Sequence, residues 1–113
     1  MMKFSCALLA LALALIAAGP PPSAKEGATI VAHGTASGAL PCMACHGGHL
    51  QGNPAIGAPR LAGLDPSVTL AALKAIAAGK MGKNYVMTNI ARSLSPTQRR
   101  AVAAYLASLP SSS

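Results

Sequence analysis

Cys42-Met43-Ala44-Cys45-His46 is the stretch that decides the fold of this 113-residue chain. Two thiols separated by two residues stand directly before a histidine, and C-x-x-C-H is the sequence to which c-type haem is attached. On a short helical turn both sulfurs would lie along one edge of the porphyrin, bonded to its vinyl groups, and the imidazole would point at the iron. The pattern predicts one covalently bound haem c, because the chain contains no internal repeat.

Other uses of a paired cysteine find less support in the sequence. A thioredoxin-like dithiol needs a βαβ unit around the pair, and no run of alternating β-branched residues predicts a strand. A structural zinc site needs four ligands, and outside the motif only His33 and His49 are left as histidines. An exported protein would ordinarily join two cysteines in a disulfide, but the histidine that follows favours haem attachment.

The composition is consistent with a cofactor at the centre of the protein. Hydrophobic residues make up 52% of the chain, but only 3% are aromatic and there is no Trp. Much of the rest is alanine, which buries little area, and a short chain already buries a modest share of its surface. A large, flat, apolar porphyrin would supply the missing bulk.

The charge is strongly basic, with a formal net charge of +7. The basic residues are scattered along the chain and do not cluster on one element, which is unlike a nucleic-acid-binding protein. A basic surface of this kind favours electrostatic guidance toward an acidic partner. We therefore expect partners with acidic docking surfaces and no nucleic acid.

The amino-terminal segment, residues 1–24, is typical of a secretory signal peptide. Lys3 precedes the apolar run 6–18, which is shorter than the roughly 20 residues needed to cross a bilayer. We predict export to the periplasm with cleavage near residue 24, or closer to Gly19, leaving 25–113 as the domain. The exported protein would then have no membrane span, and a protein that kept the segment would be tethered to the membrane.

The rest of the chain is predicted to consist of helices and loops. Asp65-Pro66 combines an N-cap with a proline in the first turn, and Ser95–Gln98 forms a capping box. Gly27 would permit a close crossing between the first and last helices, against Tyr105. The expected helices are 25–33, 66–79 and 96–109, and the expected loops are 47–63 and 80–94.

This order of elements resembles the class I c-type cytochromes. It is similar in particular to small bacterial periplasmic monohaem cytochromes and to single halves of their dihaem relatives. The resemblance covers residues 25–110, and its carriers are the segments 42–47, 58–63, 87–95 and 101–110. It implies an all-α class I cytochrome c fold, with three to four short helices around one covalently attached haem.

The resemblance also implies a set of site residues. Cys42 and Cys45 match the thioether cysteines, and His46 matches the proximal iron ligand. Pro59 matches the residue whose carbonyl accepts the imidazole N–H, which would orient the ring. Met87 matches the sixth ligand; the alternatives are Met81 in the same loop or an open sixth position. Candidate partners of the haem propionates are Arg60 and Asn84.

The function implied by the resemblance is electron transfer. An iron bound by both His46 and Met87 has no open position, so single electrons would pass without substrate binding to the metal. The protein would be a carrier rather than an enzyme, moving electrons between redox complexes of a respiratory or dehydrogenase chain. It could diffuse freely or be a fixed subunit of a dehydrogenase or oxidase. The alternative is a haem c subunit or sensor with an open sixth site for small ligands.

Overall fold

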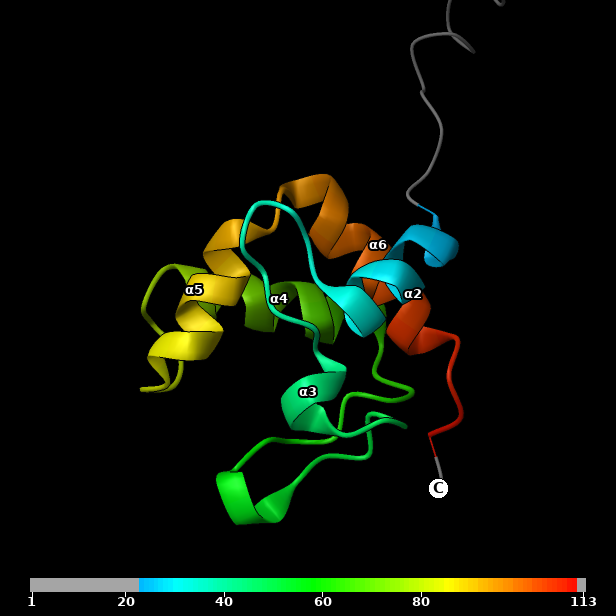
Figure 1. The fold of residues 1–113 in the computed structure, drawn as a ribbon, viewed down its shortest axis with the longest axis horizontal. Helices are drawn as coiled ribbons and strands as arrows, with labels where there is room; N and C mark the ends of the chain where they lie inside the picture. Colours follow the sequence, from blue (N-terminus) through cyan, green and yellow to red (C-terminus); the bar gives the residue numbers. More distant parts are fainter. Residues whose placement is uncertain (1–22, 112–113) are drawn as a thin grey trace, which may run out of the picture.

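A computed structural model describes residues 23–111, and this part of the chain is helical (Figure 1). Its only β-type pairing is the isolated bridge between Asn53 and Ala58. None of the helices described is long and apolar enough to cross a membrane. The elements are α2 (Ala24–His33), α3 (Met43–His46), the 3-10 helix η1 (Pro54–Ile56), α4 (Pro66–Ala77), α5 (Tyr85–Ser93) and α6 (Pro96–Ala107).

The predicted signal peptide, residues 1–24, falls almost wholly outside the described residues. Its last two residues, Ser23 and Ala24, are described: Ala24 opens α2, and the Ser23 side chain caps the helix by accepting a hydrogen bond from Lys25 N at 3.1 Å. The first helix thus starts one residue before the predicted boundary.

Helices α2 and α6 cross closely, as the sequence predicted. A Cβ at Gly27 would collide with the carbonyl oxygen of Ala101 and lie 2.9 Å from Cβ of Tyr105. Only glycine leaves room for the two backbones at this point. The crossing brings the two ends of the chain's helical part together, on the right of Figure 1.

The predicted caps begin α4 and α6. The Asp65 carboxylate accepts hydrogen bonds from the backbone N–H and the hydroxyl of Ser67, which lower the pKa of the carboxyl below its usual value. Ser95 and Gln98 form the reciprocal capping box of α6. Both helices carry proline in the first turn, where its missing N–H costs no hydrogen bond.

The prediction of a loop over 80–94 was wrong, because α5 occupies most of it. Asn84 caps this helix, and Ile90 and Ala91 bury its inner face. The described chain thus has four helices of at least two turns together with the single turn α3, one helix more than the pattern predicted. The all-α class is confirmed.

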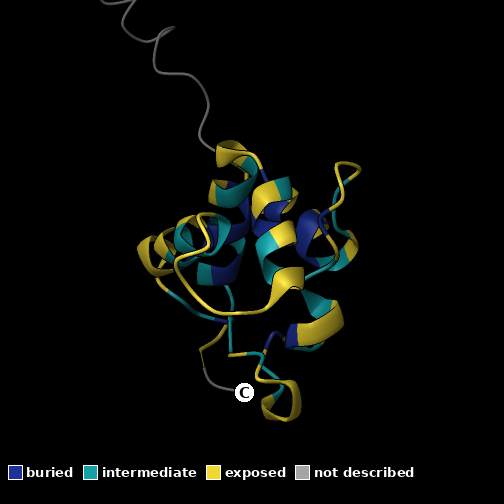
Figure 2. Cartoon of the chain, turned by 90° about the vertical axis from the view of Figure 1, so that its left-hand side faces the viewer, coloured by how far each residue is buried: buried dark blue, intermediate teal, exposed yellow. Residues whose placement is uncertain are grey.

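The buried residues lie where these helices face one another (Figure 2). Within residues 23–111 none of the buried hydrophobic residues is aromatic, and Tyr105 is only partly buried. The core is therefore built from aliphatic residues alone. Its members are Ile30, Val31, Ala39, Leu50, Ala62, Leu73, Ile90, Ala91, Leu94, Val102 and Leu106.

Replacing Gly27 by Ala should open the α2–α6 crossing, because the added methyl meets a backbone carbonyl that cannot rotate away. We expect a loss of about 1–3 kcal/mol in the free energy of unfolding, the usual range for overpacking. Guanidinium unfolding of the haem-containing protein, followed by circular dichroism, measures it. Gly48→Ala is the control, because a Cβ there meets nothing within 4 Å. Equal effects of the two substitutions would contradict the role of the crossing.

Candidate functional site

The His46 side chain is held in one orientation at the end of α3. It is 5% exposed, and its Nδ1 lies 2.8 Å from the carbonyl oxygen of Pro59. A carbonyl can only accept, so Nδ1 carries the proton in this bond. The other ring nitrogen, Nε2, then keeps its lone pair free for a metal. The two residues that the sequence paired, His46 and Pro59, are thus brought together.

The loop that presents Pro59 is fixed by its backbone. The carbonyl oxygen of Leu50 accepts from Leu61 N at 2.9 Å and from Ala62 N at 3.1 Å. Leu50 itself is fully buried and has a φ of 56°, a left-handed conformation that is uncommon for a residue other than glycine. Such a conformation persists only where its surroundings impose it. The chain just after Pro59 is therefore tied to the buried Leu50.

The two cysteines of the motif are not joined to each other by a disulfide. Cys42 is half-buried, and burial raises the pKa of its thiol above the usual value, although a backbone hydrogen bond opposes the shift. A dithiol redox centre needs a thiolate with a lowered pKa. The shift at Cys42 is in the opposite direction to the one that such a centre needs.

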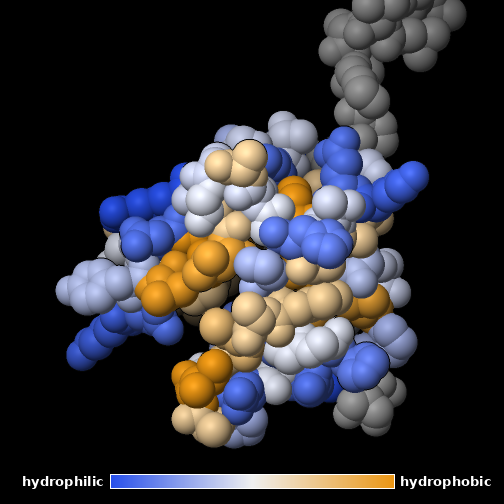
Figure 3. Space-filling model, in the orientation of Figure 1, coloured by the Kyte–Doolittle hydropathy of each residue, from blue (hydrophilic) through white to orange (hydrophobic). Residues whose placement is uncertain are grey.

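Met87 lies on α5, half-buried, among the residues that pack against the core. A hollow opens between the apolar side chains over α5 and those over α3 in the space-filling view (Figure 3). Met81 lies on the exposed loop before α5 and is 50% exposed. Of the two methionines near this helix, Met87 is the one that the fold turns toward the interior.

These donors fit a haem and do not fit a bare metal ion. Within residues 23–111 no group of three or more His, Cys, Asp or Glu side chains could hold a metal. A porphyrin brings four nitrogen ligands of its own, so a single histidine and a single methionine complete the coordination. The zinc alternative has no ligand set in the described part of the chain.

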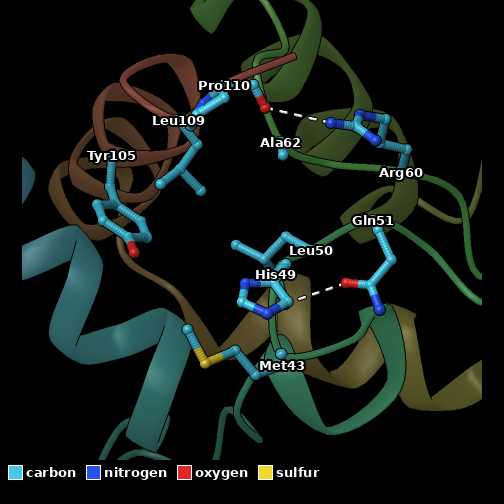
Figure 4. A pocket seen from close by; sticks show the side chains of 10 residues that line it. Met43, His49, Leu50, Gln51, Arg60, Ala62, Tyr105, Leu109 and Pro110 are labelled. Carbon is cyan, nitrogen blue, oxygen red and sulfur yellow. Dashed lines mark hydrogen bonds between the residues drawn. The ribbon is translucent and has the colours of Figure 1, made fainter. Parts of the chain in front are cut away.

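A cavity of about 580 Å³ lies apart from these donors, because neither His46 nor Met87 lines it (Figure 4). Arg60 lies at its edge and donates from Nη2 to the carbonyl oxygen of Pro110 at 3.2 Å. The side chain expected to hold a propionate therefore ties the loop of Pro59 to the carboxyl end of the chain. No local pattern in the sequence predicts this contact, because 50 residues separate its partners.

The other expected propionate partner, Asn84, also has a different contact. Its side-chain oxygen accepts from Val86 N at 2.8 Å and from Met87 N at 3.3 Å. An asparagine just before Tyr-Val-Met is a recognisable N-cap signal. The sequence therefore contains the N-cap signal of α5, inside the segment 80–94 for which we predicted a loop.

The chain matches the cytochrome c family over residues 24–110. Two curated relatives are both described as a thiosulfate dehydrogenase electron acceptor. The protein of Thiomonas intermedia (strain K12) is 44% identical over 71 residues, which are 63% of this chain and 32% of the relative. The protein of Stutzerimonas stutzeri (strain A1501) is 38% identical over 88 residues, 77% of this chain and 40% of the relative. The chain thus spans less than half of either relative.

Solved structures give the same fold. The thiosulfate dehydrogenase TsdBA of Marichromatium purpuratum superposes with a TM-score of 0.73 at 34% identity, over 77% of this chain and 19% of that one. Reduced cytochrome c4 of Pseudomonas stutzeri gives a TM-score of 0.72 at 26% identity, over 81% and 53%. Cytochrome c4 of Acidithiobacillus ferrooxidans gives 0.70 at 34% identity, over 80% and 56%.

These similarities confirm the expected class I fold and the covalent haem c. The family match covers more than half of the chain and includes the C-x-x-C-H motif. The chain belongs to the cytochrome c family and carries a covalently bound haem c.

Proposed function

We propose that this protein carries single electrons between periplasmic redox proteins, on a haem whose iron is bound by His46 and Met87. The observation that carries the proposal is the 2.8 Å contact between His46 Nδ1 and Pro59 O, which leaves the lone pair of Nε2 free for a metal. Membership in the cytochrome c family supports electron transfer as the activity. Met87 on α5 supplies a thioether on an element that borders the hollow (Figure 3).

Each residue of the site has a separate task. Cys42 and Cys45 tether the cofactor at one edge through thioether bonds. The Pro59 carbonyl fixes the His46 ring and makes the imidazole a better donor to the metal. Met87 provides a soft, neutral sulfur ligand, which raises the reduction potential and closes the sixth position. When bound, the haem supplies the one-electron change between ferric and ferrous iron.

Charge supports acidic partners. Within residues 23–111 the only acidic side chains are Glu26 and Asp65, and Lys80 and Lys83 stand on the exposed loop before α5. This positive loop would attract a partner toward the side of the molecule that holds Met87, and such attraction raises association rates. The relatives are electron acceptors of thiosulfate dehydrogenase. We therefore place this chain as the acceptor of electrons from a dehydrogenase, either as a free carrier or within a larger assembly.

The predicted signal peptide supports the periplasmic assignment, and the cap of α2 bears on where we propose the cleavage. Cleavage after Ala24 would remove Ser23, whose side chain caps α2. A cut nearer Gly19 would keep that cap, which is typically worth about 1 kcal/mol. We therefore propose that cleavage occurs nearer Gly19 than Ala24.

The intact mass of the protein recovered from the periplasm should correspond to an amino terminus between residues 19 and 23, plus one haem. Ser23→Ala should leave the cleavage position unchanged but lower the melting temperature, because it removes only the cap of α2. An amino terminus at Lys25 would contradict the proposed position. A full-length mass in the membrane fraction would show that the segment stays as a tether.

Met87→Ala should remove the sulfur-to-iron charge-transfer band of the ferric protein and allow the ferrous protein to bind carbon monoxide. The midpoint potential should fall by at least about 0.1 V, a part of the roughly 0.8 V range that axial ligands control. Optical redox titration of the purified protein measures the band and the potential, and the spectrum of the ferrous protein under carbon monoxide measures binding. Met81→Ala, six residues earlier, is the matched control and should leave the band in place.

Survival of the band in Met87→Ala, with its loss in Met81→Ala, would overturn the ligand assignment. Carbon monoxide binding by the unaltered ferrous protein would instead favour the alternative, a haem protein with an open sixth site.

A further inference from the structure

We propose that Asn84 is a positioning residue for the axial methionine. Its side chain holds the first turn of α5 and thereby keeps Met87 at the hollow. This inference rests on the proposed function, in which Met87 is the sixth ligand. It assigns to Asn84 a role in the chemistry of the iron, in addition to its part in the fold.

Asn84 accepts four hydrogen bonds at the start of this helix. Its Oδ1 accepts from Val86 N at 2.8 Å and from Met87 N at 3.3 Å. Its backbone oxygen accepts from the Thr88 N–H at 3.1 Å and from the Thr88 hydroxyl at 3.2 Å. The backbone amide of the ligand residue is therefore bonded directly to the capping side chain.

The two ends of α5 are held very differently. Near its carboxyl end, Arg99 Nη2 donates to Ala91 O at 2.7 Å, and Ser37 Oγ donates to Ser93 O at 3.0 Å. Arg92 Nε also reaches the end of α4, at Ala77 O, with a distance of 2.8 Å. These contacts come from three other parts of the chain and do not depend on the first turn.

The amino-terminal end has no comparable support. Residues 78–86 are exposed throughout. Gly79 and Gly82 have φ values of 73° and 74°, and a Cβ at either would meet nothing within 4 Å. A helix of nine residues is marginal by itself. The Asn84 cap therefore decides whether the turn that carries Met87 stays folded.

Loss of the cap should shift the balance between bound and released methionine. Removing an asparagine N-cap typically weakens a helix start by a factor of about five in equilibrium constant. An external ligand such as imidazole competes with the methionine sulfur for the iron. It should therefore bind about fivefold more tightly when the first turn of α5 frays, because less free energy is needed to release Met87.

The test uses the haem-containing protein with three variants. Asn84→Ala removes the cap, and Asn84→Ser keeps a neutral capping oxygen. Ser95→Ala is the matched control, because it removes the N-cap of α6 and leaves the cap of α5, Asn84, unchanged. Imidazole titration of the ferric protein and hydrogen exchange of the Val86 and Met87 amides are measured on each.

We expect Asn84→Ala to bind imidazole about fivefold more tightly and to exchange both amides faster, with a weaker sulfur-to-iron band. Asn84→Ser should restore all three properties, and Ser95→Ala should lower thermal stability without changing imidazole affinity. Equal imidazole affinities in Asn84→Ala and the unaltered protein, with faster amide exchange, would overturn the positioning role. Equal increases in Asn84→Ala and Ser95→Ala would overturn it as well, since a general loss of stability would explain both.

The same measurements distinguish this outcome from an error in the ligand assignment itself. If Met87 is not the ligand, Met87→Ala leaves the band and the imidazole affinity unchanged, while the two amides still exchange faster in Asn84→Ala. The exchange measurement thus reports on the cap itself, and the optical measurements report on ligation.

Discussion

A single hydrogen bond, from Nδ1 of His46 to the carbonyl oxygen of Pro59, joins the attachment motif to the loop that follows it. Because a carbonyl only accepts, this contact selects one tautomer and leaves Nε2 as the metal-binding nitrogen. The buried, left-handed Leu50 fixes the loop through its own carbonyl oxygen. The orientation of the ligand ring is thus set by backbone geometry rather than by side chains that could change rotamer.

The rest of the fold follows from how little apolar bulk the chain has. The buried hydrophobic residues of the described part are aliphatic, and the α2–α6 crossing at Gly27 brings backbones into direct contact instead of packing large side chains. A covalent porphyrin provides what such a core lacks, a large apolar body that the chain can surround. The hollow lies between the side chains over α3 and those over α5 (Figure 3). The amino-terminal end of α5 is exposed and is the least supported part of the site.

Much of this arrangement could be predicted from short sequence signals. The motif predicted the cofactor, Asp65-Pro66 and the Ser95 capping box predicted the helix starts, and Gly27 predicted the contact with Tyr105. Helix α5 was missed because its first residues are exposed and its cap, Asn84, lacks a following proline. The bond from Arg60 to Pro110 could not be found locally, since it joins distant residues and depends on the completed fold.

The most direct test of the central claim, that a haem joined to the motif completes this core, is extraction of the purified protein with acidified acetone. We expect the colour to stay with the polypeptide, and its spectrum in alkaline pyridine to be that of a porphyrin with both vinyl groups saturated. Double replacement of Cys42 and Cys45 by Ala should leave a colourless chain without cooperative unfolding. A colourless protein that still unfolds cooperatively would contradict the claim.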